Sequence, residues 1–124
     1  MPKILIVDDA EDFRLVLSYI LGQAGYEVAQ AVDGAEALEM IAKEPPELAI
    51  VDWNMPKMNG LELCQAVRQN PAVSRLPIIM LTVRRQDTDH AEGIHHGADL
   101  YLSKPIEPDQ ILAHVKSLLR QKIE

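Results

Sequence analysis

Short, unbroken apolar runs recur along the chain and predict strands buried on both faces. Residues 4–7, 48–51 and 78–81 are rich in branched aliphatic side chains, and each run is too short for a typical helix. A strand covered on both faces carries such a run, whereas a strand with one wet face alternates apolar and polar residues. Two weaker segments, residues 27–30 and 100–102, complete a set of five predicted strands.

Helical patterns lie between these runs. Apolar residues recur at helical spacing in segments 13–21, 37–42, 63–67 and 111–119. Gly25 stands where the first helix should stop, and Pro108 suits the start of the last one. A further segment, residues 87–96, has the weakest helical pattern, because it contains few apolar side chains and a glycine.

The alternation of buried strands with helices predicts an α/β fold, with a doubly wound parallel sheet of five strands and helices on both faces. The sequence has no internal repeat, low-complexity tract or linker, so we expect residues 1–124 to form one domain.

Charge and cysteine content narrow the classes of function. The formal net charge is −7 and no basic stripe is visible, which argues against direct nucleic-acid binding by this segment. Cys64 is the one cysteine, so no internal disulfide forms, and its place on an apolar stripe indicates a core residue. The first apolar run is too short for a signal peptide or a membrane span. We therefore expect a soluble, cytoplasmic protein.

Three aspartates follow two of the predicted strands: Asp8 and Asp9 follow the first, and Asp52 follows the third. Ligands of an open α/β sheet bind beyond the carboxyl ends of its strands. If these two strands are neighbours, the three carboxylates converge, and a bound cation would relieve their repulsion. Magnesium is the natural candidate, since it accepts one or two carboxylates together with phosphate oxygens. The alternative is that each aspartate only begins a turn or caps a helix.

Two further polar residues stand at strand ends. Thr82 ends the fourth predicted strand, and Lys104 follows the fifth. A hydroxyl and an ammonium can each donate to a phosphoryl oxygen, whereas alone a threonine there is unremarkable and a lysine is a solvated charge. Together with the three aspartates, they indicate a site that accepts a phosphoryl group.

Four motifs, at these separations, resemble the receiver domain of bacterial two-component response regulators: VDDAED, VDWNMPKMNGLEL, IIMLT and GADLYLSKP. The second motif is especially similar to that of the single-domain chemotaxis regulators of this family. The resemblance covers nearly the whole chain. It implies a flavodoxin-like sheet with strand order 2-1-3-4-5 and five helices.

The resemblance also implies a metal site and an acceptor. Asp52 would be the phosphoacceptor. Asp9 and Asp52 would bind Mg²⁺ (or Mn²⁺) directly, Asp8 would reach the ion through water, and the backbone carbonyl of Asn54 would complete the protein ligands.

Four more residues acquire roles from the same resemblance. Lys104 would pair with Asp52 and then with the phosphoryl group, and Thr82 would swing its hydroxyl toward that group. Tyr101 matches the aromatic switch position that turns inward when Thr82 moves. The bond between Lys104 and Pro105 would be cis.

The function implied is that of a phosphorylation switch in two-component signalling. A sensor histidine kinase or a histidine phosphotransfer protein would donate the phosphoryl group, and an effector protein or a fused output domain would respond to changes near the fourth helix and fifth strand. The domain would catalyse only its own phosphorylation and dephosphorylation, as a monomer or a phosphorylation-dependent dimer. The charged end of the chain is compatible with a true terminus or with a linker to an effector domain.

Two residues depart from the family pattern. Val83 replaces the usual small residue after Thr82, and we predict slower phosphoryl exchange because a β-branched side chain crowds the site. Leu100 stands where many dimerising members have an aspartate, so the charged pairs of that dimer are incomplete. His90, His95 and His96 are spaced poorly for a shared metal ion and indicate a solvated face. Trp53 is either half-exposed beside the site or buried.

Two other functions are compatible with parts of this pattern. A magnesium-dependent phosphatase using an aspartyl phosphate would have a second Asp two residues after the nucleophile, where this chain has Asn54. An FMN-binding module would need a loop that cradles phosphate after the first strand, where Asp8 and Asp9 would repel it. Both are weaker hypotheses than the receiver.

Overall fold

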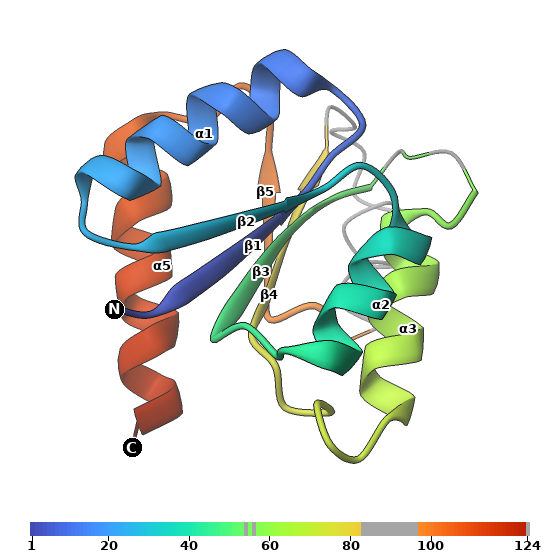
Figure 1. The fold of residues 1–124 in the computed structure, drawn as a ribbon. Coiled ribbons are helices and arrows are strands. Elements are labelled where there is room, and N and C mark those ends of the chain that lie inside the picture. Colours follow the sequence, from blue (N-terminus) through green and yellow to red (C-terminus); the bar gives the residue numbers. More distant parts are fainter. Residues whose placement is uncertain (54, 56, 83–96, 124) are drawn as a thin grey trace.

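Five parallel strands form the centre of the computed structural model, which describes residues 1–53, 55, 57–82 and 97–123. In chain order the strands are β1 (Lys3–Val7), β2 (Glu27–Ala31), β3 (Leu48–Asp52), β4 (Ile78–Thr82) and β5 (Leu100–Ser103). Their order across the sheet is β2-β1-β3-β4-β5 (Figure 1). All five predicted strands and the expected topology are therefore confirmed.

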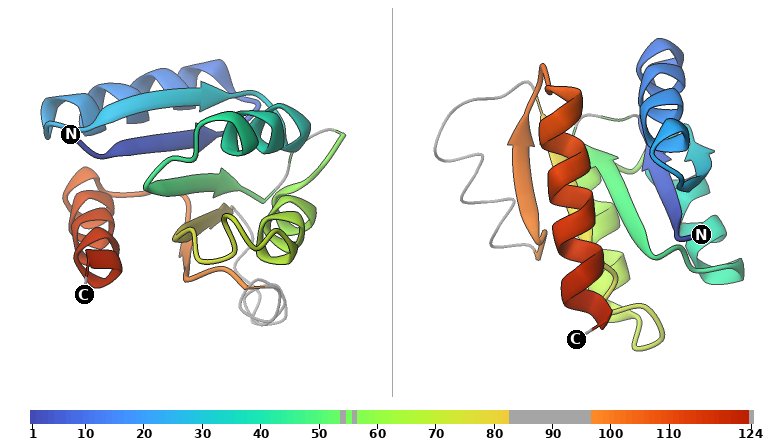
Figure 2. Two further views of the ribbon diagram at one scale, coloured as in Figure 1. Left: turned by 60° about the horizontal axis from the view of Figure 1, so that its bottom comes forward. Right: turned by 90° about the vertical axis from the view of Figure 1, so that its left-hand side faces the viewer.

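Helices cover both faces of this sheet. On one face lie α1 (Glu11–Gln23) and α5 (Pro108–Ile123), and on the other lie α2 (Gly34–Lys43) and α3 (Gly60–Gln69) (Figure 1 and Figure 2). The described residues thus form four helices, one fewer than the five expected, and the weakest prediction, 87–96, lies outside them. Within the same residues, no helix is long and apolar enough to cross a membrane.

The central strands are buried on both sides, which explains their unbroken apolar sequences. Ile4 and Ile6 of β1 belong to the core under α1 and α5, whereas Leu5 and Val7 belong to the core under α2 and α3. Successive side chains of β3 and β4 divide between the two cores in the same way. A polar side chain can enter these strands only at their ends, and the predicted site residues Asp52 and Thr82 lie there.

The helix ends follow the signals in the sequence. After α1, Gly25 adopts a φ of +97°, a left-handed conformation that is strained for residues with a side chain. At the other end of the chain, α5 begins at Pro108, where a missing backbone N–H costs nothing.

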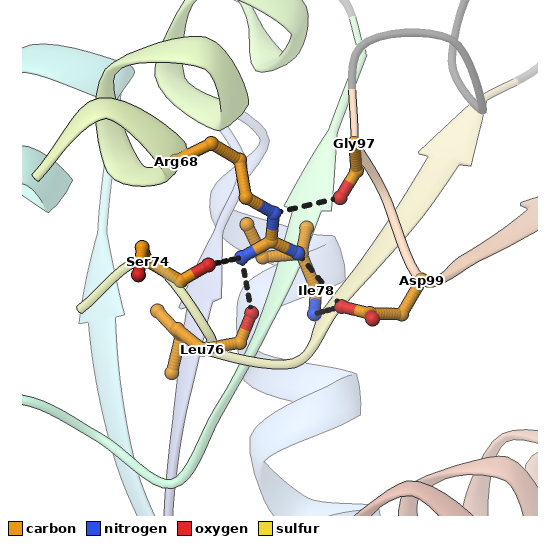
Figure 3. A network of polar contacts seen from close by, with 6 residues as sticks. All are labelled: Arg68, Ser74, Leu76, Ile78, Gly97 and Asp99. Atoms are coloured by element: carbon orange, nitrogen blue, oxygen red, sulfur yellow. Dashed lines mark hydrogen bonds and ion pairs between the residues drawn. The ribbon is translucent and has the colours of Figure 1, made fainter. Parts of the chain in front are cut away.

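Arg68, on α3, joins three segments at the amino ends of β4 and β5 (Figure 3). Its guanidinium donates to three backbone carbonyl oxygens, those of Leu76 at 2.7 Å, Gly97 at 2.9 Å and Ser74 at 3.1 Å. It also donates to the Asp99 carboxylate at 2.8 Å, and the same carboxylate oxygen accepts from the Ile78 N–H at 2.8 Å. We call Arg68, Asp99 and these backbone groups the Arg68 cluster. It fixes the starts of β4 and β5 relative to α3.

Candidate functional site

The strand order brings three aspartates together. β1 and β3 are neighbours, with Val7 opposite Val51, so Asp8 and Asp52 lie side by side at the carboxyl edge of the sheet. One carboxylate oxygen from each of Asp8, Asp9 and Asp52 lies within 4.8 Å of the others. The carboxylates therefore converge as expected from adjacent strands.

Asp8 is held by several hydrogen bonds. Its side chain is buried, with 1% of the residue exposed. One carboxylate oxygen accepts from the Ala10 N–H at 2.9 Å, and the other accepts from Lys104 Nζ at 2.9 Å. Arg14 donates to the Asp8 backbone carbonyl at 2.8 Å. These bonds fix both the loop after β1 and the direction of its carboxylate.

Lys104 reaches the three aspartates from the end of β5, the outer strand on the other side of β4 from β3. It follows β5, and its Nζ lies 2.9 Å from Asp8 and 3.6 Å from Asp52. The resemblance implied a pair with Asp52, but the shorter contact is with Asp8. The lysine side chain is 18% exposed, and its bond to Pro105 is cis, as the resemblance implied. We call Asp8, Asp9, Asp52 and Lys104 the Lys104 cluster.

The Lys104 cluster carries more negative than positive charge, since three carboxylates face one ammonium. Asp8 and Asp52 are both buried, and solvent screens repulsion least in such places. Hard carboxylate oxygens beside a region where charge must be neutralised suit Mg²⁺ or Mn²⁺. The residues present therefore fit a divalent cation, and the three aspartates would hold it.

The first residue of α3 packs directly against the backbone of Asp52. Gly60, the first residue of α3, packs so tightly that a Cβ there would lie 2.5 Å from the Asp52 carbonyl oxygen. Its N–H donates to the Trp53 carbonyl at 3.0 Å. Asn59 and Glu62 form a capping box that begins the helix at this point. The chain that leaves Asp52 is thereby pinned against α3.

Comparison with known proteins identifies the family. The family model of the response regulator receiver domain matches residues 4–116, a span that includes the whole Lys104 cluster. The chain belongs to the response regulator receiver domain family. It is therefore a receiver domain of two-component signalling.

Curated relatives match nearly the whole of this chain but are themselves about twice as long. The phosphate regulon transcriptional regulatory protein PhoB of Rhizobium meliloti (strain 1021) is 40% identical over 121 residues, covering 98% of this chain and 53% of that protein. The alkaline phosphatase synthesis transcriptional regulatory protein PhoP of Bacillus subtilis (strain 168) is 41% identical over 119 residues, covering 96% and 49%. The chain spans about half the length of these curated relatives.

A solved receiver matches over nearly its whole length. The crystal structure of the chemotaxis protein CheY4 of Vibrio cholerae has a TM-score of 0.90 and 39% sequence identity. The match covers 95% of this chain and 98% of that one.

The structure describes some of the remaining predicted site residues, and others lie outside the described part of the chain. Thr82 ends β4 in register with Ser103 of β5, at the same edge of the sheet as the Lys104 cluster. Tyr101 lies edge-on to Trp53, with ring centroids 6.0 Å apart and planes at 72°. The predictions for Asn54, Val83, His90, His95 and His96 fall outside the described residues.

The burial of two residues bears on the sequence predictions made for them. Trp53 is buried, with 4% exposed, so the half-exposed alternative is wrong. Cys64 is buried among apolar neighbours, as predicted. Burial raises the pKa of its thiol, Arg68 opposes that rise, and Asp99 adds to it.

Three contributors to the site were not singled out in the sequence. Phe13 was assigned only to the apolar stripe of the first helix, yet Lys104 Nζ lies 4.1 Å from its ring centroid. Arg14 and Gly60 position Asp8 and Asp52 through backbone contacts. For Phe13 and Arg14, the sequence signal was their position a few residues after Asp8 and Asp9, which places them near the site.

Proposed function

We propose that this receiver domain accepts a phosphoryl group on Asp52 from the phosphohistidine of a sensor kinase or a histidine phosphotransfer protein. The supporting observation is that Asp52 lies among two other carboxylates and the Lys104 ammonium at one sheet edge. With 8% of the residue exposed, Asp52 is buried but not sealed. A nucleophile in that position can meet a donor that docks over the carboxyl edge.

The transfer is a single displacement at phosphorus. A carboxylate oxygen of Asp52 forms a bond to phosphorus as the phosphorus–nitrogen bond of the donor breaks, and the imidazole leaves with the electron pair of that bond. The product is a mixed anhydride that water later hydrolyses, returning the carboxylate and inorganic phosphate. Such a reaction needs mainly positioning and charge neutralisation.

The residues of the chain supply both needs. A divalent cation held by the three aspartates would neutralise phosphoryl oxygens. Lys104, 3.6 Å from Asp52 in this state, is near enough to pair with a phosphoryl oxygen after a small movement. Thr82, at the end of the neighbouring strand, would donate its hydroxyl.

Phosphorylation adds about −1.5 to −2 charge, which biases a two-state element. We propose that Thr82 and Tyr101 carry the change toward the surface near β5 and the segment before it. The responder would be an effector protein or a fused output domain, and the receiver would act as a monomer or a phosphorylation-dependent dimer in the cytoplasm. It would turn over no external substrate.

The test uses beryllofluoride, which mimics the phosphoryl group, with Mg²⁺. We expect a saturable, magnesium-dependent change in Trp53 fluorescence that disappears in Asp52→Asn. Asp109→Asn, an equivalent change at an exposed position on α5, should respond like the wild type. Incubation with a small phosphoryl donor should add one phosphoryl group to Asp52, located by mass spectrometry. A response that survives in Asp52→Asn, or modification at another residue, contradicts the proposal.

A further inference from the structure

An aromatic ring lies beside the ammonium of the Lys104 cluster. The distance of 4.1 Å from Lys104 Nζ to the Phe13 ring centroid is well inside the range of a cation–π interaction. We propose that Phe13 is a positioning residue: its ring holds Lys104 where the ammonium can pair with Asp52 and then with the phosphoryl group. This inference depends on the proposed function, because it concerns the same site.

The ring is fixed independently of the lysine. Phe13 lies near the start of α1 and packs against the core between the sheet, α1 and α5. The next residue, Arg14, donates to the Asp8 backbone carbonyl and to the Gln30 side chain. The first turn of α1 is thus tied to β1 and β2, and the ring face presented to Lys104 is set by that packing.

The ring differs chemically from the Asp8 and Asp52 carboxylates that lie near the ammonium. Asp8 would be engaged by a divalent cation, and Asp52 would become an acyl phosphate, so both anionic partners change during the reaction. A π face keeps its attraction for a cation throughout and tolerates sideways movement. Since Lys104 has a flexible stem and its side chain is 18% exposed, the ring would keep the ammonium from turning to water.

The ordinary alternative is that Phe13 only fills the core, and two substitutions separate these readings. Phe13→Leu keeps an apolar side chain without a π face, whereas Phe13→Tyr keeps the ring. At saturating Mg²⁺, we expect Phe13→Leu to bind beryllofluoride about fivefold more weakly, and Phe13→Tyr to bind with wild-type affinity. Affinity for Mg²⁺ alone should not fall in either variant, because the three carboxylates are unchanged and an ammonium displaced from Asp8 and Asp52 competes less with the ion.

Tyr26→Leu is the matched control. Tyr26 also packs against the core of α1 and α5, but it precedes β2 at the opposite edge of the sheet. Removing its ring should lower the stability to urea and leave beryllofluoride affinity unchanged. A loss of affinity in Tyr26→Leu equal to that in Phe13→Leu would assign the effect to general core loosening and overturn the proposal.

A spectroscopic measurement tests the contact without phosphoryl chemistry. Methylene protons near a ring face are shifted upfield, so the Cε protons of Lys104 should show such a shift in the wild type and in Phe13→Tyr, and lose it in Phe13→Leu. Wild-type protein without the shift, or Phe13→Leu with undiminished beryllofluoride affinity, overturns the positioning role. Wild-type protein with the shift but no beryllofluoride binding overturns the proposed function itself, and the positioning role with it.

Discussion

The two edges of the sheet hold two ionic clusters of opposite character. At the amino edge, the Arg68 cluster pairs one guanidinium with one carboxylate, and the other acceptors are neutral backbone carbonyls. At the carboxyl edge, the Lys104 cluster sets one ammonium against three carboxylates. Both clusters join segments far apart in the sequence, but only the first is balanced in charge.

This difference separates a structural role from a functional one. A balanced cluster with satisfied donors and acceptors has nothing to gain from a ligand, and it is costly to disturb. An unbalanced cluster stores repulsion that a cation would relieve, so the Lys104 cluster is the candidate binding site. Contacts between basic residues and aspartates are therefore expected to stabilise the fold at the amino edge, whereas crowded carboxylates are expected to lower its stability at the carboxyl edge.

The largest effect should come from breaking the balanced cluster. Arg68→Met leaves the carbonyl oxygens of Ser74, Leu76 and Gly97 without their donor, and it leaves Asp99 without its cation. We expect the free energy of unfolding to fall by about 3 kcal/mol. Urea unfolding measures this loss. Arg68→Lys should recover only part of it, because an ammonium cannot match the guanidinium fork; full recovery would reduce the cluster to a simple charge pair.

Magnesium should act only on the unbalanced cluster. At about 100 times its dissociation constant, Mg²⁺ should raise the free energy of unfolding by about 2.7 kcal/mol, and a chelator should reverse the gain. Urea unfolding with and without Mg²⁺ checks this. Asp9→Asn should lose most of the gain, while Arg68→Met should keep it in full despite its lower starting stability. Equal losses in both variants would contradict the separation of the two clusters.

One chemical change made at both edges should have opposite signs. Without metal, Asp52→Asn removes a buried charge from the crowded cluster and should stabilise the protein by about 1 kcal/mol. Asp99→Asn removes the anionic partner of Arg68 and should destabilise it by about 1–2 kcal/mol. Urea unfolding in the presence of a chelator compares the two. Effects of the same sign would show that charge balance does not distinguish the edges.

Much of this arrangement could be predicted from local patterns. The apolar runs of β1, β3 and β4 are unbroken because both faces of these strands are covered. The order of apolar residues along the chain was therefore enough to predict these three strands. Asp8 and Asp52 could be expected to meet, since adjacent parallel strands end at one edge. The resemblance to receivers added the order of the strands and the roles of individual residues.

The pairings themselves could not be predicted in the same way. Lys104 bonds to Asp8 across 96 positions of sequence, and Arg68 bonds to Asp99 across 31. Each depends on the exact path of a loop, which periodicity does not describe. Phe13 reads as an ordinary core residue because a helical stripe reports burial and not what lies over the ring. Arg68 was given no role from the sequence, because nothing in the chain around it indicates which distant segments its side chain contacts.

The smallest expected effect uses Cys64 as a probe of the Arg68 cluster. Burial raises the pKa of the Cys64 thiol, and Arg68 partly opposes this. The unfolded chain ionises its thiol at the ordinary pKa of about 8.5, while the folded protein still holds the proton. Stability should therefore fall as pH rises above that value, until the folded thiol also ionises.

The loss attributable to Cys64 should grow as pH rises above about 8.5, and it is measured as the difference between wild type and Cys64→Ala. This comparison cancels the lysines and tyrosines that titrate in the same range. In an Arg68→Met background the folded thiol lacks its opposing cation, so the fall should continue to a higher pH. An identical pH profile in the two backgrounds would mean that the Arg68 guanidinium does not lower the pKa of the buried Cys64 thiol. The charge of Arg68 would then act only on the groups that it contacts directly.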